Sequence, residues 1–201
     1  MSIEATNFHP VNTFINSAVV EGIDTIRVTK DPKIIAVDEA TFAKFIESDF
    51  KNGIIEVKVL SKLLENAPDF ARGFIGIAFR IDEHNSRFEC MYIRPTNGRA
   101  DDQLRRNRST QYFSYPDFKF DRLREEAPGK YESYADMGLN EWIQIKVEVK
   151  DEQAKLYLDD GEYPVLVVND LKHGANAAGG VGLWVDVGTE GYFAELRIEN
   201  Q

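Results

Sequence analysis

Apolar and polar residues alternate with a period of two along much of the chain, the pattern of β-strands that have one buried and one exposed face. The clearest run covers residues 142–149. Ile143, Ile145, Val147 and Val149 fall on one face of this run, while the residues between them are polar or charged. The run therefore predicts a strand with one face in the core and one face in water.

Similar runs bounded by Gly, Asp, Asn or Pro predict many further short strands. They cover residues 19–29, 33–37, 53–60, 73–81, 87–94, 154–159, 164–168, 180–187 and 192–199. We expect a meander over residues 142–168, with a tight turn at Asp160-Gly161, and a closing pair formed by the last two strands. Residues 38–45 are expected to form a helical turn with Asp38 as its N-cap. Many short strands and almost no helix predict an all-β sandwich or barrel.

One segment, residues 95–137, breaks this rhythm because its strand pattern is weak. A structureless segment of this length inside a compact domain is unusual, and such segments are often functional. It is rich in aromatic residues, so we expect it to pack against one face of a sheet; they are Tyr112, Phe113, Tyr115, Phe118, Phe120, Tyr131 and Tyr134.

The 201 residues contain no internal repeat and no linker rich in Pro, Gly or Ser. We therefore expect residues 1–201 to form one domain, with residues 95–137 as its insert. The longest apolar stretch, residues 73–79, is far shorter than the roughly 20 residues that a membrane helix needs. The first 14 residues lack the pattern of a signal peptide, so a cytoplasmic location is expected unless a leader was removed.

The net charge of −10 argues against a nucleic-acid partner and against binding to anionic membranes. The charge is unevenly distributed, however. Residues 94–130 carry seven Arg and two Lys against four Asp and two Glu. This local positive excess indicates either a segment ordered by its own ion pairs or a contact with an anionic ligand.

Three stretches carry a resemblance to a known superfamily: GFIGIAFRIDEHNSRFECMYIR, EWIQIKVEVKDEQAKLYLDDGEYPVLVV and GGVGLWVDVGTEGYFAELRI. Their order resembles the concanavalin A-like lectin/glucanase superfamily and, within it, the domains grouped as 3-keto-disaccharide hydrolase-like. The resemblance implies an antiparallel two-sheet jelly roll and a carbohydrate ligand. It does not decide between binding and catalysis, because this sandwich hosts both. The E-x-D-x-x-E run that glucanases of the superfamily usually carry is absent.

The strand predicted over residues 73–81 suggests where a ligand would bind. One of its faces carries Ile75, Ile77, Phe79 and Ile81, whereas the other carries the small Gly76 and Ala78 beside Arg80, which predicts a hollow. Tyr92 and Arg94 of the next strand would border this hollow if they lie beside Arg80. Aromatic rings stack on the apolar faces of sugars, and an arginine fork suits a uronate. In the alternative, these arginines pair with the acidic excess elsewhere.

Further residues join this candidate site from the long insert and from the strand over residues 180–187. Trp184 points away from the apolar set of its strand, so it is either a stacking platform or packed beneath the insert. The predicted ligand-binding residues are Arg80, Tyr92, Arg94, Arg99, Gln111, Tyr134 and Trp184.

No catalytic or metal-binding motif stands out. Glu132 and Asp136 are the nearest pair of acids, but residues four apart on a strand lie about 13 Å from each other, so we interpret them as surface carboxylates. The three histidines are widely separated and Cys90 is the only cysteine. We therefore predict no histidine metal site, no disulfide and no cofactor, while calcium binding through Asp or Asn oxygens stays open.

The hypothesis we favour is a carbohydrate-binding domain that holds a glycan or a glycan-derived ligand on a concave sheet face. The alternatives are a glycoside hydrolase of the 3-keto-disaccharide hydrolase-like kind, and a non-catalytic domain whose insert contacts a protein. The sequence leaves the ligand, the catalytic residues and the oligomeric state open.

Overall fold

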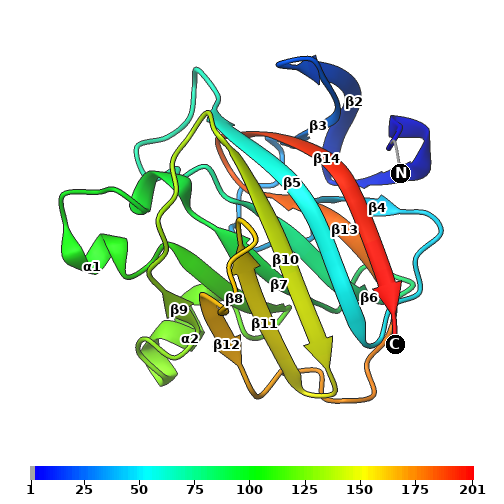
Figure 1. Ribbon diagram of the computed structural model, residues 1–201, viewed down its shortest axis with the longest axis vertical. Helices are drawn as coiled ribbons and strands as arrows, with labels where there is room; N and C mark the ends of the chain where they lie inside the picture. The colour runs from blue at the N-terminus through cyan, green and yellow to red at the C-terminus, as the bar shows by residue number, and fades with distance from the viewer. Residues whose placement is uncertain (1–2) are drawn as a thin grey trace.

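The structure, a computed structural model, describes residues 3–201 as two antiparallel sheets of seven strands each, packed face to face (Figure 1). The first sheet has the order β1-β4-β13-β6-β7-β8-β9 and the second β12-β11-β10-β5-β14-β3-β2. Their inner faces enclose the hydrophobic core. The all-β sandwich predicted from the alternation is confirmed.

The strands of the first sheet are β1 (Phe8–Val11), β4 (Phe42–Phe45), β6 (Ile75–Ile81), β7 (Phe88–Ile93), β8 (Thr110–Tyr115), β9 (Glu132–Ser133) and β13 (Gly180–Val185). Those of the second sheet are β2 (Thr13–Val20), β3 (Ile23–Lys30), β5 (Gly53–Leu63), β10 (Trp142–Lys150), β11 (Gln153–Leu158), β12 (Leu166–Val168) and β14 (Thr189–Asn200). Two short helices, α1 (Gln103–Arg106) and α2 (Phe120–Glu126), and two 3₁₀ turns, Ala5–Asn7 and Pro95–Asn97, complete the described elements. None of the helices in residues 3–201 is long and apolar enough to cross a membrane.

The second sheet has the one wet face that the alternation predicts. In β10 the residues Ile143, Ile145, Val147 and Val149 are buried, and those between them are partly exposed. β11 pairs with β10 and β12 pairs with β11, so the predicted meander is confirmed.

The first sheet is different, because both of its faces are covered. Every residue of β6, β7 and β13 is buried. A side chain at Gly191 of the second sheet would meet Val185 and Ile75, so these two residues lie on the inner face. Gly76 pairs with Tyr92 and Trp184 and therefore lies with them on the outer face. The outer face of this sheet is thus a second packed layer rather than a wet surface.

The insert predicted over residues 95–137 is not structureless: two of its segments, β8 and β9, are strands of the first sheet, and Leu123 of α2 packs into the core. Its β8 pairs with β7 along six residue pairs, and β9 continues the sheet beyond β8. The strand is hard to recognise because its first five residues are buried, so polar and apolar residues do not alternate in it. Helices α1 and α2 flank this edge of the sandwich (Figure 1).

Several element predictions for the first 45 residues were wrong. The run over residues 19–29 contains the turn between β2 and β3, where Glu21 and Gly22 have φ of 52° and 81°. Residues 33–37 form no strand, and residues 38–45 contain β4 instead of a helical turn. Asp38 itself has φ of 51°, and its carboxylate accepts a hydrogen bond from Phe120 N at the start of α2, 2.8 Å away. It thus caps a helix that lies 82 residues further along the chain.

The last two strands also differ from the prediction. The expected closing pair is split between the sheets, because β13 pairs with β4 and β6 whereas β14 pairs with β3 and β5. Gly188, with φ of 74°, lies in the connection that crosses between the sheets. A side chain there would come within 2.8 Å of Ala71 Cβ, so the crossing requires glycine.

Candidate ligand-binding cleft

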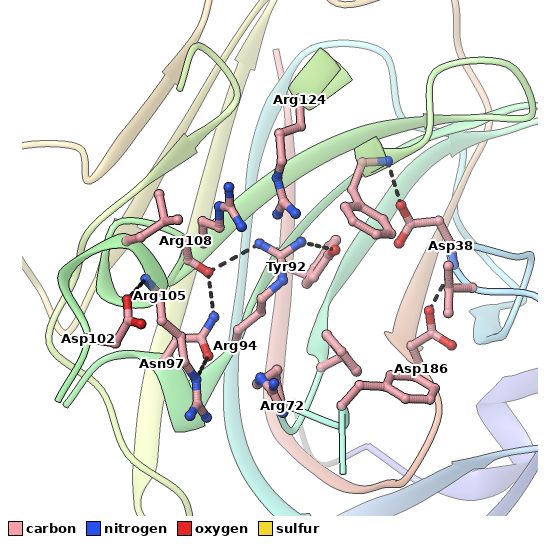
Figure 2. A pocket seen from close by; sticks show the side chains of 15 residues that line it. Asp38, Arg72, Tyr92, Arg94, Asn97, Asp102, Arg105, Arg108, Arg124 and Asp186 are labelled. Atoms are coloured by element: carbon pink, nitrogen blue, oxygen red, sulfur yellow. Dashed lines mark hydrogen bonds between the residues drawn. The ribbon is translucent and has the colours of Figure 1, made fainter. Parts of the chain in front are cut away.

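A cleft of about 340 Å³ opens where β7 ends and β6 begins, at one end of the first sheet (Figure 2). Four chain segments line it together with the end of β13: residues 37–38, 70–74, 92–108 and 120–124. The size suits one or two sugar rings.

Five arginines line this cleft: Arg72, Arg94, Arg105, Arg108 and Arg124. They come from the loop before β6, the end of β7, α1, the turn after α1, and α2. Figure 2 shows the guanidinium groups of Arg94, Arg108 and Arg124 gathered around one space, with Asp38 and Asp186 on the far side of Tyr92.

Arg94 is the buried centre of this group. Its Nη2 donates to Tyr92 Oη at 2.7 Å and to Gln111 Oε1 at 3.0 Å, and its Nη1 donates to the Arg108 carbonyl at 3.1 Å. The guanidinium carbon also lies 5.0 Å from the centre of the Tyr92 ring. Because both terminal nitrogens are held, Arg94 is a fixed positive charge and not a mobile one.

A single carboxylate, Glu132 of β9, serves three of the arginines. Its Oε1 lies 3.4 Å from Arg94 Nη1, its Oε2 lies 3.8 Å from Arg108 Nε, and both oxygens accept from Arg124 Nε at 3.1 Å. One buried negative charge therefore faces three positive charges, and the group keeps a positive excess.

The other two arginines form no ion pair with a carboxylate of residues 3–201 within 4.0 Å. Arg72 Nη1 donates to the carbonyls of Asp69 and Ala71, at 2.7 and 2.9 Å. Arg105 Nε donates to Asn97 Oδ1 at 2.8 Å. The pKa of Arg72 is lowered, first by burial and then by repulsion from Arg105 and Arg94. The three charges thus repel one another in a space that an anion would fill.

Two carboxyl groups lie on the opposite wall. Asp186 is held at both oxygens: its Oδ1 lies 2.6 Å from Lys30 Nζ, and its Oδ2 accepts from Asp38 N at 2.8 Å. The pKa of Asp38 is raised from 3.8 to about 7, first by burial and then by the charge of Asp186. At neutral pH, Asp38 is therefore close to half protonated.

Apolar side chains complete the cleft. Phe70 and Leu104 are 54% and 60% exposed, and Phe74 and Phe120 are partly exposed. The guanidinium of Arg124 lies 5.0 Å from the centre of the Phe120 ring, which stabilises both groups. The walls of the cleft therefore carry both positive charges and apolar surfaces.

Of the residues predicted from the sequence, Tyr92 and Arg94 line the cleft. Gln111 lies behind them and accepts the Arg94 hydrogen bond. Trp184 is fully buried, packs 4.7 Å from the Tyr92 ring and donates its Nε1 hydrogen to the Glu39 carbonyl. It is packed beneath other segments and does not reach the cleft.

Arg80 does not join them. It lies 2% exposed in a nest of loop oxygens, where it donates to the carbonyls of Lys51, Gly174 and Asp151 at 2.8 to 3.0 Å. The cause is a bulge: the pairing of β6 with β13 shifts register next to Arg80, whose φ is 54°. Simple alternation would place Arg80 on the face of Tyr92, and the bulge redirects its side chain. The register also separates the two residues along the sheet, since Tyr92 pairs with Gly76. The predicted hollow over Gly76 is likewise occupied, since Tyr92 lies against it and both are buried.

Arg99 and Tyr134 also lie outside the cleft. Arg99 binds Asp136 at 2.8 Å and Glu141 at 2.9 Å, and the Tyr134 hydroxyl accepts from Arg106 Nη2 at 3.1 Å. Asp136 belongs to the Arg99 network outside the cleft, whereas Glu132 pairs with the cleft arginines. Glu132 is buried, which corrects its interpretation as a surface carboxylate.

Sequence reasoning missed Arg72, Arg105, Asp38 and Asp186 as parts of this cleft. Asp38, Arg72 and Asp186 come from loops that are far apart in the chain, and Arg105 comes from the short helix α1, so no local pattern marks them as parts of one site. The positive excess of residues 94–130 indicated a possible contact with an anionic ligand for this segment, which contains Arg105, but it did not single that residue out. Within residues 3–201 no group of three or more His, Cys, Asp or Glu side chains is placed to hold a metal ion.

No family model matches the chain, and no curated protein matches it. Solved structures do. The carbohydrate-binding module CBM66 from Bacillus subtilis is similar with a TM-score of 0.65 at 15% identity, covering 96% of each chain. A putative glycosyl hydrolase from Parabacteroides distasonis has a TM-score of 0.57 at 12% identity, covering 98% of this chain and 90% of its own.

A Bacillus subtilis protein of unknown function with a galectin-like fold is also similar, with a TM-score of 0.56 at 9% identity, covering 98% of this chain and 90% of its own. The chain thus has the two-sheet jelly-roll fold of these proteins. The resemblance found in the sequence is confirmed at this level. At these identities the likeness concerns the fold.

Proposed function

We propose that this chain is a carbohydrate-binding domain whose cleft holds a sugar that carries a carboxylate or a similar acid group. The observation that carries this proposal is the uncompensated charge of Arg72 and Arg105 beside the Arg94 group. The names of two fold neighbours, a carbohydrate-binding module and a putative glycosyl hydrolase, point toward the same class of ligand.

The chemistry of the cleft matches such a ligand. A guanidinium group presents parallel N–H donors to the two oxygens of a carboxylate, and the contact is strong where water is excluded. The rings of Phe70 and Phe120 offer apolar surface to the C–H face of a sugar. The Asp102 carboxylate also lines the cleft; its Oδ1 accepts from Arg105 N at 2.9 Å, and its other oxygen can accept from a sugar hydroxyl.

The site lies at the end of the first sheet and not over its centre. The centre of the outer face is packed with buried rings, such as Tyr92, Trp184 and Phe113. We therefore place the ligand among the loops beyond Arg94 and not in the hollow expected over Gly76.

Glycoside hydrolysis is the second candidate, and Asp38 is the observation that favours it. A carboxyl with a pKa near 7 beside a second carboxyl group is a combination that acid catalysis uses. Asp186, however, is held by Lys30 and by the backbone N–H groups of Asp38 and Val187, so it is not free to act as a nucleophile or base. Binding is therefore the better supported function.

Calorimetric titration with glucuronic acid and with glucose tests the proposal. We expect glucuronic acid to bind at least about tenfold more tightly than glucose, and Arg105→Ala to remove most of this difference. Arg197→Ala is the matched control, because Arg197 is an exposed arginine on β14, outside the cleft. Absence of binding to acidic sugars, or equal loss in both variants, would show the proposal to be wrong.

A further inference from the structure

A second hollow, a groove of about 260 Å³, adjoins the cleft. Most of its wall is apolar and comes from two loops, with Pro32, Ile34 and Ile35 on one side and Leu64, Pro68 and Phe70 on the other. Ile35 is 88% exposed, the largest value among the exposed large hydrophobic residues of the described chain. Apolar surface concentrated in this way marks a contact site.

The groove and the cleft are two parts of one trough. Residues 30–35 line the groove and residues 37–38 line the cleft. In the second segment, residues 64–70 line the groove and residues 70–74 line the cleft. In the third, residues 187–188 line the groove and Asp186 lines the cleft. Phe70 belongs to both walls. Three separate segments thus pass side by side from the groove to the cleft, so one ligand can span both.

Two of the three polar side chains of the groove, Lys30 and Asp31, already form hydrogen bonds within the protein. Lys30 Nζ binds Asp186 Oδ1 at 2.6 Å and the Ala36 carbonyl, and Asp31 Oδ1 accepts from Lys33 N at 2.9 Å. Asn66 is the remaining polar side chain on its wall. A sugar ring placed here would lose hydrogen bonds to water without replacing them, whereas an apolar group would gain by leaving water.

We propose that the natural ligand is a glycoside with two unlike ends: an acidic sugar in the arginine cleft and an apolar aglycone, aryl or alkyl, in the groove. This inference rests on the proposed function and adds the nature of the group attached to the sugar. The arginine cleft fixes the orientation, because it accepts only the charged end.

The test compares methyl and phenyl β-glucuronide by calorimetric titration of the full chain. We expect the phenyl compound to bind about tenfold more tightly than the methyl compound, since the phenyl ring leaves water for the groove. The gain should fall below about twofold in Ile35→Ser, a substitution that touches the groove only. Ile46→Ser is the matched control: Ile46 is 62% exposed and lines neither hollow, so the gain should persist.

The outcomes separate this inference from the function on which it rests. If both glucuronides bind equally, or if Ile35→Ser keeps the full gain of the phenyl group, the aglycone assignment is wrong and the acidic-sugar site stands. If neither glucuronide binds to the wild-type chain, both proposals are wrong.

Discussion

The carboxyl of Asp38 should make the free energy of unfolding fall as pH rises, which an exposed aspartate would not do. It is 1% exposed and lies beside Asp186, with the Phe120 N–H and the charges of Arg94 and Lys119 as partial compensation. Burial and Asp186 dominate, so its pKa rises from 3.8 to about 7. The folded state therefore holds a proton that the unfolded chain releases near pH 4.

The size of the effect follows from linkage. Between the two pKa values the folded state binds more protons than the unfolded state, so the free energy of unfolding falls as pH rises and levels off above the folded pKa. With pKa values of 3.8 and about 7, the decrease between about pH 5 and pH 9 is about 3 kcal/mol.

The perturbation is Asp38→Asn, which keeps the acceptor for Phe120 N and removes the titration. Urea unfolding of the wild type and the variant across this pH range gives the difference between them, in which titrating groups that do not interact with Asp38 cancel. We expect the variant to gain about 3 kcal/mol relative to the wild type on going from about pH 5 to pH 9. A difference that stays constant with pH would refute the buried, protonated Asp38. An ionised, salt-bridged carboxylate would titrate below about pH 4, outside this range, and would therefore also give a constant difference.

Three further substitutions test the packing around the cleft. Glu132→Gln leaves three guanidinium groups without their carboxylate and should lower the free energy of unfolding by about 3 to 5 kcal/mol in urea titrations; a change below about 1 kcal/mol would contradict the network. Arg80→Met should cost about 3 kcal/mol and leave sugar affinity within about twofold, whereas lost affinity at unchanged stability would return Arg80 to the binding site. Gly76→Ala would place a Cβ 2.2 Å from Met91 O, so we expect a thermal unfolding midpoint well below that of the wild type; an unchanged midpoint would contradict the close packing of β6 on β7.

The alternation of residues was sufficient to predict the strands that have one wet face. β10 follows the prediction residue by residue, and the meander to β12 follows with it. These strands are predictable because water on one face forces polar residues into every second position. The same reasoning fails for β8, whose sequence TQYFSY is buried on both faces and shows no alternation.

The candidate site was only half predictable for a related reason. Tyr92 and Arg94 follow from the alternation of β7, because the strand is regular up to its end. Arg80 is misplaced by a single bulged residue in β6, and the remaining arginines of the cleft lie in loops or on the two short helices α1 and α2. Which loops meet at one end of a sandwich depends on the crossing of β13 and β14 into different sheets, and no local pattern encodes that crossing.

The charge arrangement of the cleft connects the fold to the proposed function. A structural ion-pair network would match each guanidinium with a carboxylate, as Arg99 is matched with Asp136 and Glu141. Around Arg94 one glutamate serves three arginines, while Arg72 and Arg105 are held by carbonyl or amide oxygens that fix them without neutralising them. Such an arrangement costs free energy, because like charges are kept close to one another around the buried Arg94. An anion that enters the cleft would complete the pairing and offset this cost. We therefore propose the arginine cleft, and not the packed sheet face, as the ligand site.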